Sequence, residues 1–184
     1  MFLLFKKLNF LIDHQPHDPR WYELQIIITN QILHVRDFKY WYELIHEKFP
    51  DTSQAWMAKA LFPGVGFHQS KTSLKRALKK DPENPYIHYY LGKTYRNLRN
   101  YQQAIASLSQ CLRLDKHFYL AYLLRSDCYK EIGDLKHTIQ DAFSAVCYMN
   151  DVNKQYIFKK ILDEFERKSN SSNRLPVKNE DRSN

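Results

Sequence analysis

The sequence predicts an all-α protein made of repeated antiparallel helix pairs, and three observations support this prediction. The stretch around Tyr95 and Ile105 recurs further along the chain, where Tyr129 and Ile139 take the matching places at one constant interval. The chain has 4 glycines among 184 residues, which favours helices over turn-rich β folds. Apolar residues make up 43% of the chain and recur with helical spacing between breaks that contain Pro or Asn. We therefore expect a helical-repeat solenoid with additional helices at both ends.

The first fifty residues predict helices that flank the repeats. Two lysines interrupt the apolar run of "MFLLFKKLNFLID", so the run is too short for a secretory signal or a membrane span. We expect a first helix there, and an organellar targeting role is the open alternative. Asp18 and Pro19 are predicted to be the N-cap and the N1 residue of a second helix. A third helix is expected from about Asp37 until Pro50.

Helix signals continue through the middle of the chain to residue 168. Caps at residues 51–53 precede a short helix, and the Gly-rich break "FPGVGFHQ" separates it from the next one. Turns are expected at Asn100 and at Gly133-Asp134. The expected helices cover residues 54–61, 70–80, 86–98, 101–114, 119–132, 135–148 and 151–168.

This pattern resembles the tetratricopeptide repeat family, whose members repeat a helix pair at intervals of about 34 residues. In the strongest repeat, Leu91, Gly92 and Tyr95 form the LGxxY pattern of the family. In the next repeat, Ser126 is the small residue and Tyr129 follows three residues later. The small residue lets the first helix approach the second, and the tyrosine fills the space between repeats. The resemblance implies a right-handed solenoid of antiparallel helix pairs.

An earlier and weaker repeat is expected before these two. Trp56 and Ala60 are placed at its Trp and small-residue positions, which makes the interval from Trp56 to His88 slightly shorter than the period of the later repeats. The resulting domain limits are 1–50 for N-terminal helices or a divergent repeat, 51–84, 85–118 and 119–152 for three repeats in 51–152, 153–168 for a C-terminal capping helix, and 169–184 for a disordered tail.

The resemblance implies that the first helix of each pair lines a concave groove that binds a peptide or a partner helix. The expected groove residues are Tyr86, Tyr89, Tyr90, Lys93, Arg96, Asn97, Leu120, Leu123, Asp127 and Lys130. Lys59 and Trp56 are expected to add to this face from the weaker repeat. Tyrosines, leucines and cations suit a partner with apolar anchors and acidic residues. The alternative for Leu120, Leu123 and Leu124 is packing against the C-terminal helix.

One subtype of the family holds the acidic C-termini of chaperones with a clamp of Lys, Asn and Arg. In this chain, Tyr90, Leu120 and Leu124 stand where Asn, Lys and Arg are expected. Met57 and Leu61 are placed where the first repeat has Lys and Asn. The clamp is therefore absent, and a role as a cochaperone is not expected.

We expect no catalytic, cofactor or metal site, and therefore no enzyme. The segment "GVGFHQSKT" has Ser70 where a phosphate-binding loop has Gly, and it follows a helix instead of a strand. The eight histidines are scattered, and no pair has a persuasive ligand spacing. Cys111, Cys128 and Cys147 fall within apolar helical patterns, which indicates small buried hydrophobes in a reducing compartment.

The predicted function is a non-catalytic protein-interaction module: an adaptor, or a structural subunit of a larger assembly. The net charge of +8 favours acidic partners. RNA or other nucleic-acid binding by a basic helical surface is the alternative, for which Lys75-Arg76 and Lys79-Lys80 form a local stripe. Such stripes are more often solvated helix faces. An intracellular, cytoplasmic location is expected, with a mitochondrial one left open.

Overall fold

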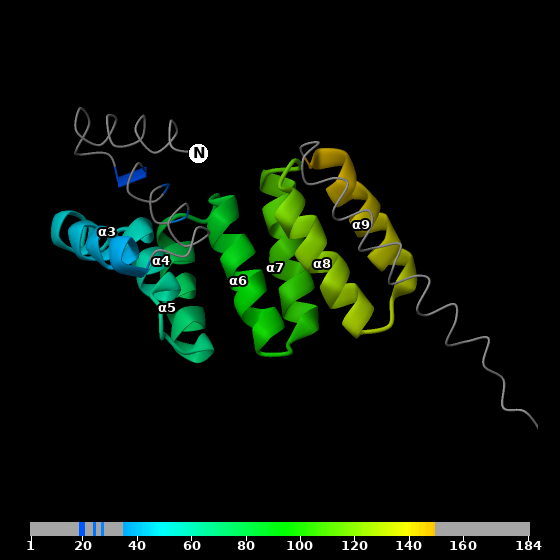
Figure 1. The fold of residues 1–184 in the computed structure, drawn as a ribbon, viewed down its shortest axis with the longest axis horizontal. Coiled ribbons are helices and arrows are strands. Elements are labelled where there is room, and N and C mark those ends of the chain that lie inside the picture. The colour runs from blue at the N-terminus through cyan, green and yellow to red at the C-terminus, as the bar shows by residue number, and fades with distance from the viewer. Residues whose placement is uncertain (1–18, 21–23, 25–26, 28–34, 150–184) are drawn as a thin grey trace, which may run out of the picture.

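The computed structural model describes residues 19–20, 24, 27 and 35–149, and in this part of the chain every regular element is an α-helix. The elements are α3 (Val35–Lys48), α4 (Ser53–Leu61), α5 (Phe67–Lys80), α6 (Pro85–Asn97), α7 (Tyr101–Leu114), α8 (Tyr119–Glu131) and α9 (Leu135–Tyr148). Figure 1 shows α4–α5, α6–α7 and α8–α9 as antiparallel pairs stacked side by side, with α3 at one end. The all-α helical-repeat prediction is confirmed.

The helix limits repeat with the period found in the sequence. The second helices of the pairs, α5, α7 and α9, begin at Phe67, Tyr101 and Leu135, at equal intervals along the chain. The first helices α6 and α8 begin at Pro85 and Tyr119, which lie the same interval apart. Helix α4 begins at Ser53, two residues later than this period places it. Helix α5 begins three residues before the expected start, so the Gly-rich break is shorter than predicted.

Within each pair, a small residue lets the two helices approach. A Cβ atom on Gly92 would lie 2.6 Å from Cγ of Leu108 and 3.3 Å from the carbonyl oxygen of Ala104. One repeat period away on either side are Ala58, which is 0% exposed, and Ser126, which is 8% exposed. A larger side chain at Gly92 would separate the two helices of its pair.

These positions correct the register expected for the first pair. By the repeat period, Ala58 is equivalent to Gly92 and Gln54 to His88, and all four residues are buried. The sequence-based prediction placed Trp56 instead of Gln54 at this position, which made the interval to His88 two residues shorter than the period. The choice was wrong because Trp is typical of this position in the family, whereas here the buried polar Gln54 occupies it.

The turns inside the last two pairs have a residue with positive φ at the same place in the repeat. Gly133 has φ of 80°, and Arg99, one repeat period earlier, has φ of 57°. Each turn is followed by an N-cap: the side chain of Asn100 accepts a hydrogen bond from the backbone N–H of Gln103, and Asp134 accepts one from His137. The predicted turns therefore coincide with the observed helix starts.

Helix α3 covers part of the first pair. Phe38, Trp41 and Ile45 form a buried cluster with Ala58 of α4. The ring of Tyr42 lies 4.6 Å from that of Phe62 at the end of α4. Trp41 and Tyr42 of α3 thus help to cover the first pair. The predicted helices before residue 19 and over 151–168, and the tail 169–184, lie outside the described residues.

The cysteines differ from the sequence prediction at one position. Cys111 and Cys128 are buried, but Cys147 is exposed. Burial raises the pKa of the Cys111 thiol to about 12 and that of Cys128 to about 11. The prediction was wrong for Cys147 because it lies on the outer face of α9, the last described helix, where no described helix follows to cover it. None of the described helices has both the length and the apolar character needed to cross a membrane.

Candidate partner-binding surface

The expected groove residues of the two clearest repeats lie on α6 and α8, which contact each other. We call the face that carries them the α6–α8 surface. Asn84 fixes the start of α6, because its side chain accepts a hydrogen bond from the N–H of Tyr86 at 3.0 Å. Pro85 follows at the first helical position, where its missing N–H has no helical partner to lose.

The N-terminal part of this surface is aromatic. The rings of Tyr86 and Tyr89 lie 5.2 Å and 5.1 Å from the ring of Phe118, which immediately precedes α8. Burial, with further contributions from Cys111 and Tyr119, raises the pKa of Tyr89 to about 12. Phe118 was not among the predicted groove residues, because it ends a repeat and only helical positions were assigned to the groove.

Tyr90 belongs to the interior of the protein. It is 3% exposed and is part of the main core cluster. Its ring also lies 5.2 Å from that of Tyr89. In this structure Tyr90 therefore supports Tyr89 from behind and offers almost no surface to a ligand.

The C-terminal part of the surface is charged. Arg96 of α6 forms an ion pair with Asp127 of α8, so two of the predicted groove residues neutralise each other. Lys93, one turn before Arg96, is exposed. The structure thus leaves Lys93 as the cation of α6 that points to solvent without an ion pair to a described carboxylate.

Asn97 lies at the edge of a shallow polar depression. Its lining residues are Arg96, Asn97, Arg99, Tyr101 and Glu131. The hydroxyl of Tyr101 donates a hydrogen bond of 3.3 Å to the carboxylate of Glu131. Burial and the neighbouring Glu131 carboxylate raise the pKa of Tyr101. This depression joins α6 to the end of α8 and is too polar to bind an apolar anchor.

The predicted residues of α8 are only partly accessible. Leu120, Leu123 and Lys130 are half-buried, and Leu124 packs against the core cluster. Half-buried leucines can contribute apolar contact area to a partner without being exposed as a large patch. The structure therefore brings together Tyr86, Tyr89 and Lys93 on α6 with a leucine face on α8.

The last repeat contains an ion pair that was not predicted from the sequence. The guanidinium of Arg125 donates hydrogen bonds of 2.7 Å and 2.8 Å to the two carboxylate oxygens of Asp141, and one of 2.8 Å to the hydroxyl of Ser109. Burial alone would lower the pKa of Arg125, but the hydrogen bonds and charge of Asp141 raise it. The available signal was an Arg at a position where the family has Leu.

No group of three or more His, Cys, Asp or Glu side chains that could hold a metal ion occurs among the described residues. The ion pair and the hydrogen bond described for the α6–α8 surface both connect helices. This arrangement can bind another molecule by contact, and the described residues present no nucleophile held next to a general base.

The comparisons with known proteins agree with this architecture. The family model for the tetratricopeptide repeat matches residues 73–106, which run from the second half of α5 into α7. The family model thus supports the predicted resemblance over the length of one repeat. A search of curated proteins finds no match to the chain.

Several solved structures share the fold. A thermophilic tetratricopeptide-repeat protein of Thermus thermophilus is 18% identical with a TM-score of 0.62, over 84% of this chain and 87% of that chain. The Cut9–Hcn1 hetero-tetramer of the APC/C gives 12% identity and a TM-score of 0.69, over 78% of this chain and 28% of that one. The second repeat domain of Spaghetti (RPAP3), bound to the HSP90 peptide SRMEEVD, is 16% identical with a TM-score of 0.51, over 53% of this chain and 92% of that chain. At these identities the likeness is one of fold.

Proposed function

We propose that this tetratricopeptide-repeat protein is a non-catalytic interaction module that binds a peptide or a partner helix on its α6–α8 surface. In this role it is an adaptor or a subunit of a larger assembly. The observation that carries the proposal is the combination of half-buried Tyr86 and Tyr89 with exposed Lys93 on one helix. Aromatic side chains that are fixed by their neighbours bind at low entropic cost.

The chemistry of this surface indicates the kind of partner. An apolar side chain of the partner would contact the tyrosines and Leu123, and a carboxylate would pair with Lys93. Arg96 contributes less to this charge recognition, because Asp127 already neutralises it. The partner is therefore expected to have an apolar anchor followed by an acidic residue.

The Spaghetti domain is bound to a chaperone peptide, but this chain lacks the clamp that one subtype of the family uses for acidic chaperone C-termini. The corrected register places Ala55 and Lys59 where the chaperone clamp has Lys and Asn in its first repeat. The remaining clamp positions are occupied by Tyr90, Leu120 and Leu124, and Tyr90 is buried. The missing clamp supports recognition of a different sequence.

The test is affinity purification of the tagged protein from its native source, comparing two surface variants. We expect Lys93→Glu to lose a stoichiometric protein partner, because the substitution reverses the charge that would pair with the partner's carboxylate. Lys136→Glu on α9 is the matched control, since Lys136 is also exposed and changes the net charge equally. A partner retained by Lys93→Glu, or lost equally with Lys136→Glu, would contradict the proposal.

A second variant tests the aromatic part of the surface. Tyr89→Leu keeps an apolar contact with Phe118 but removes the ring that a partner would meet. We expect weaker partner capture with unchanged helicity measured by circular dichroism. Unchanged capture would show that Tyr89 only supports the core.

A further inference from the structure

The cations of the described chain are distributed unevenly. Residues 53–80, which form the α4–α5 pair, contain six Lys and Arg and no Asp or Glu. Residues 85–149 contain eight Lys and Arg against five Asp and Glu. The α4–α5 pair therefore carries more Lys and Arg than either of the other two pairs, and Asp51, Asp81 and Glu83 lie just outside its ends.

These cations gather on the outer side of the pair. Lys75 and Lys79 are four residues apart on α5, as are Arg76 and Lys80, so all four lie on one side of the helix. All four are exposed. Lys59 of α4 adds a fifth cation near Arg76, because both lie over the ring of Trp56. We call these five cations with Trp56 the α4–α5 basic patch.

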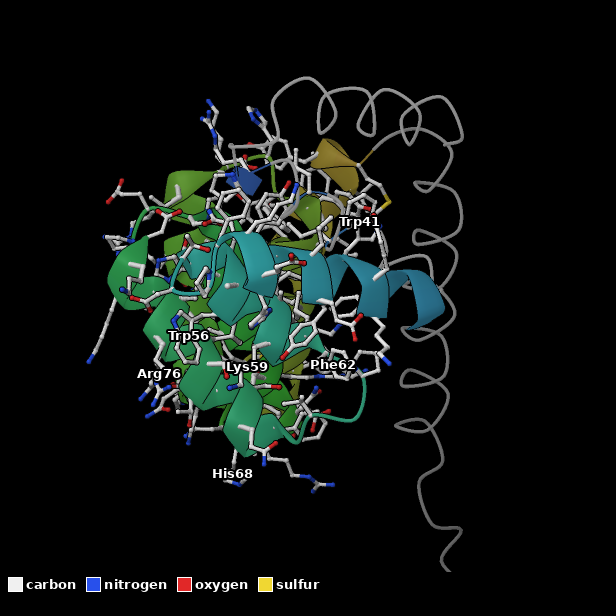
Figure 2. The ribbon with its side chains drawn as sticks, turned by 90° about the vertical axis from the view of Figure 1, so that its left-hand side faces the viewer. Trp41, Trp56, Lys59, Phe62, His68 and Arg76 are labelled. Carbon is white, nitrogen blue, oxygen red and sulfur yellow. The ribbon has the colours of Figure 1, made fainter. Side chains whose placement is uncertain are left out.

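Trp56 is held in place at the centre of the patch. The Nζ atom of Lys59 lies 5.2 Å from the ring centroid, and Cζ of Arg76 lies 4.6 Å from it. The indole N–H donates a hydrogen bond of 3.1 Å to Asp51. Figure 2 shows Trp56, Lys59 and Arg76 together at the end of the stack, away from Trp41 of α3.

The patch is not neutralised within the described part of the protein. Lys80 pairs with Asp51 at 2.5 Å, but Lys59, Lys75, Arg76 and Lys79 form no ion pair with a described carboxylate. Arg96 and Arg125, in the other two pairs, are each paired with an Asp. Cations kept without internal partners are available to an external anion.

The phosphate backbone of a nucleic acid fits this patch better than a protein surface does. Protein interfaces have apolar cores in which lysine is depleted, whereas interfaces with nucleic acids are polar and strongly positive. The patch has four cations without a described ion pair and one partly exposed indole ring. An aromatic ring beside a guanidinium is a platform on which an unpaired base can stack. We infer that the α4–α5 basic patch binds single-stranded nucleic acid through its phosphates, with Trp56 as the stacking residue.

This site is separate from the α6–α8 surface, so the two proposals can fail independently. The probe is a short fluorescein-labelled oligouridylate, and the measurement is fluorescence anisotropy between about 50 and 200 mM salt. Each lost phosphate contact makes the slope of log Kd against log salt shallower by about 0.7 for single strands. We expect Lys75→Gln with Lys79→Gln to reduce the slope by about 1.4 and to leave the fold unchanged.

The matched control is Lys116→Gln with Lys136→Gln, which removes the same charge from exposed positions outside the patch. We expect this control, and Lys93→Glu of the α6–α8 surface, to retain the wild-type slope. An equal loss in patch and control variants would mean that only net charge matters, and would overturn the site. No binding at the lowest salt concentration, or binding of a poly-glutamate peptide in place of the oligouridylate, would overturn the proposed ligand.

Trp56→Leu tests the stacking role directly. Leu retains apolar contact with the core, against which Trp56 is packed, but has no ring face. We expect affinity for the oligouridylate to fall about tenfold, and the tryptophan fluorescence change on binding to disappear. Unchanged affinity together with a retained fluorescence change would exclude Trp56 from the site.

Discussion

The first and last helix pairs share one framework but distribute their charges in opposite ways. In α4–α5, the residues between the helices are neutral, such as Met57 and Ser73, and the cations lie outside. In α8–α9, the same positions, two repeat periods later, hold the ion pair of Arg125 with Asp141. The outer face of α9 is apolar: Leu135, Ile139 and Phe143 are 58%, 50% and 71% exposed.

The difference shows which positions the repeat constrains. Ala58, Gly92 and Ser126 are all buried, and at Gly92 and Ser126 the two helices of the pair lie close together. Positions outside this contact carry Lys in one pair and Leu or Phe in another. The fold therefore depends on a few small and apolar positions, and the surfaces of the pairs are free to specialise.

The largest expected effect comes from exchanging the inner residues of the two pairs. We expect Asp141→Ser, which introduces the first pair's residue, to lower the free energy of unfolding by about 3 kcal/mol, because it leaves Arg125 buried without its carboxylate. Side-chain exposures of 17% for Arg125 and 5% for Asp141 place the pair inside the protein. Urea denaturation followed by circular dichroism measures the effect.

The double variant Arg125→Met with Asp141→Ser is the control, since it gives the last pair both inner residues of the first. Replacement of a whole buried ion pair by an apolar side chain is often neutral or stabilising. We therefore expect the double variant to recover most of the lost stability. A double variant as unstable as Asp141→Ser would show that the inner surfaces of the two pairs are not interchangeable.

This exchange also marks the limit of what the sequence could predict. The repeat period and residues such as Gly92 predicted the helix pairs, because close helix approach requires a small residue at a fixed interval. The partner of Arg125 could not be predicted, since Asp141 lies on another helix and no local pattern links the two residues. Tyr90 was assigned to the groove by its position in the repeat, and its burial depends on tertiary packing.

The charged surfaces were also predicted only in part from the sequence. The stripe of Lys75 to Lys80 was visible in the sequence, because cations four residues apart share a helix face. The contact of Arg76 with Trp56 was not, since it joins two helices. Which of these cations are paired could not be predicted either: Asp51 pairs with Lys80, whereas Lys75, Arg76 and Lys79 form no ion pair with a described carboxylate.

A smaller effect is expected from the turns, in which the two end pairs agree and the middle pair differs. Gly64 and Gly133, in the first and last pairs, have φ of 87° and 80°, whereas the middle pair has Arg99 at 57°. A side chain makes the left-handed region costly, by about 1 kcal/mol. We expect Arg99→Gly to stabilise the protein by up to about 1 kcal/mol, measured by thermal and urea denaturation.

Gly133→Ala is the reciprocal change in the last pair. Nothing lies within 4 Å of the Cβ that it adds, so only the backbone conformation is affected. We expect it to destabilise the protein by about 1 kcal/mol. If Arg99→Gly also destabilised the protein, contacts of the Arg99 side chain in the polar depression would outweigh its backbone strain.

The smallest effect on stability is expected at the apolar outer face of α9. Phe143→Ser alters a side chain that is 71% exposed, so the free energy of unfolding should change by no more than about 0.5 kcal/mol. We expect Phe143→Ser to have a larger effect on self-association of the protein than on its free energy of unfolding. Leu135, Ile139, Phe143 and Cys147 recur at every fourth residue, which places them on one stripe of the helix.

The predicted capping helix 153–168 lies outside the described residues, and the test of the stripe uses a chain without it. We expect a chain that ends at Met149 to expose the stripe and to self-associate with increasing concentration, as measured by light scattering. Phe143→Ser in the shortened chain should reduce that association, and Lys75→Gln at the opposite end should not. If the shortened chain stays monomeric at all concentrations, the stripe does not need a cover, and the contrast between the two ends is one of surface composition alone.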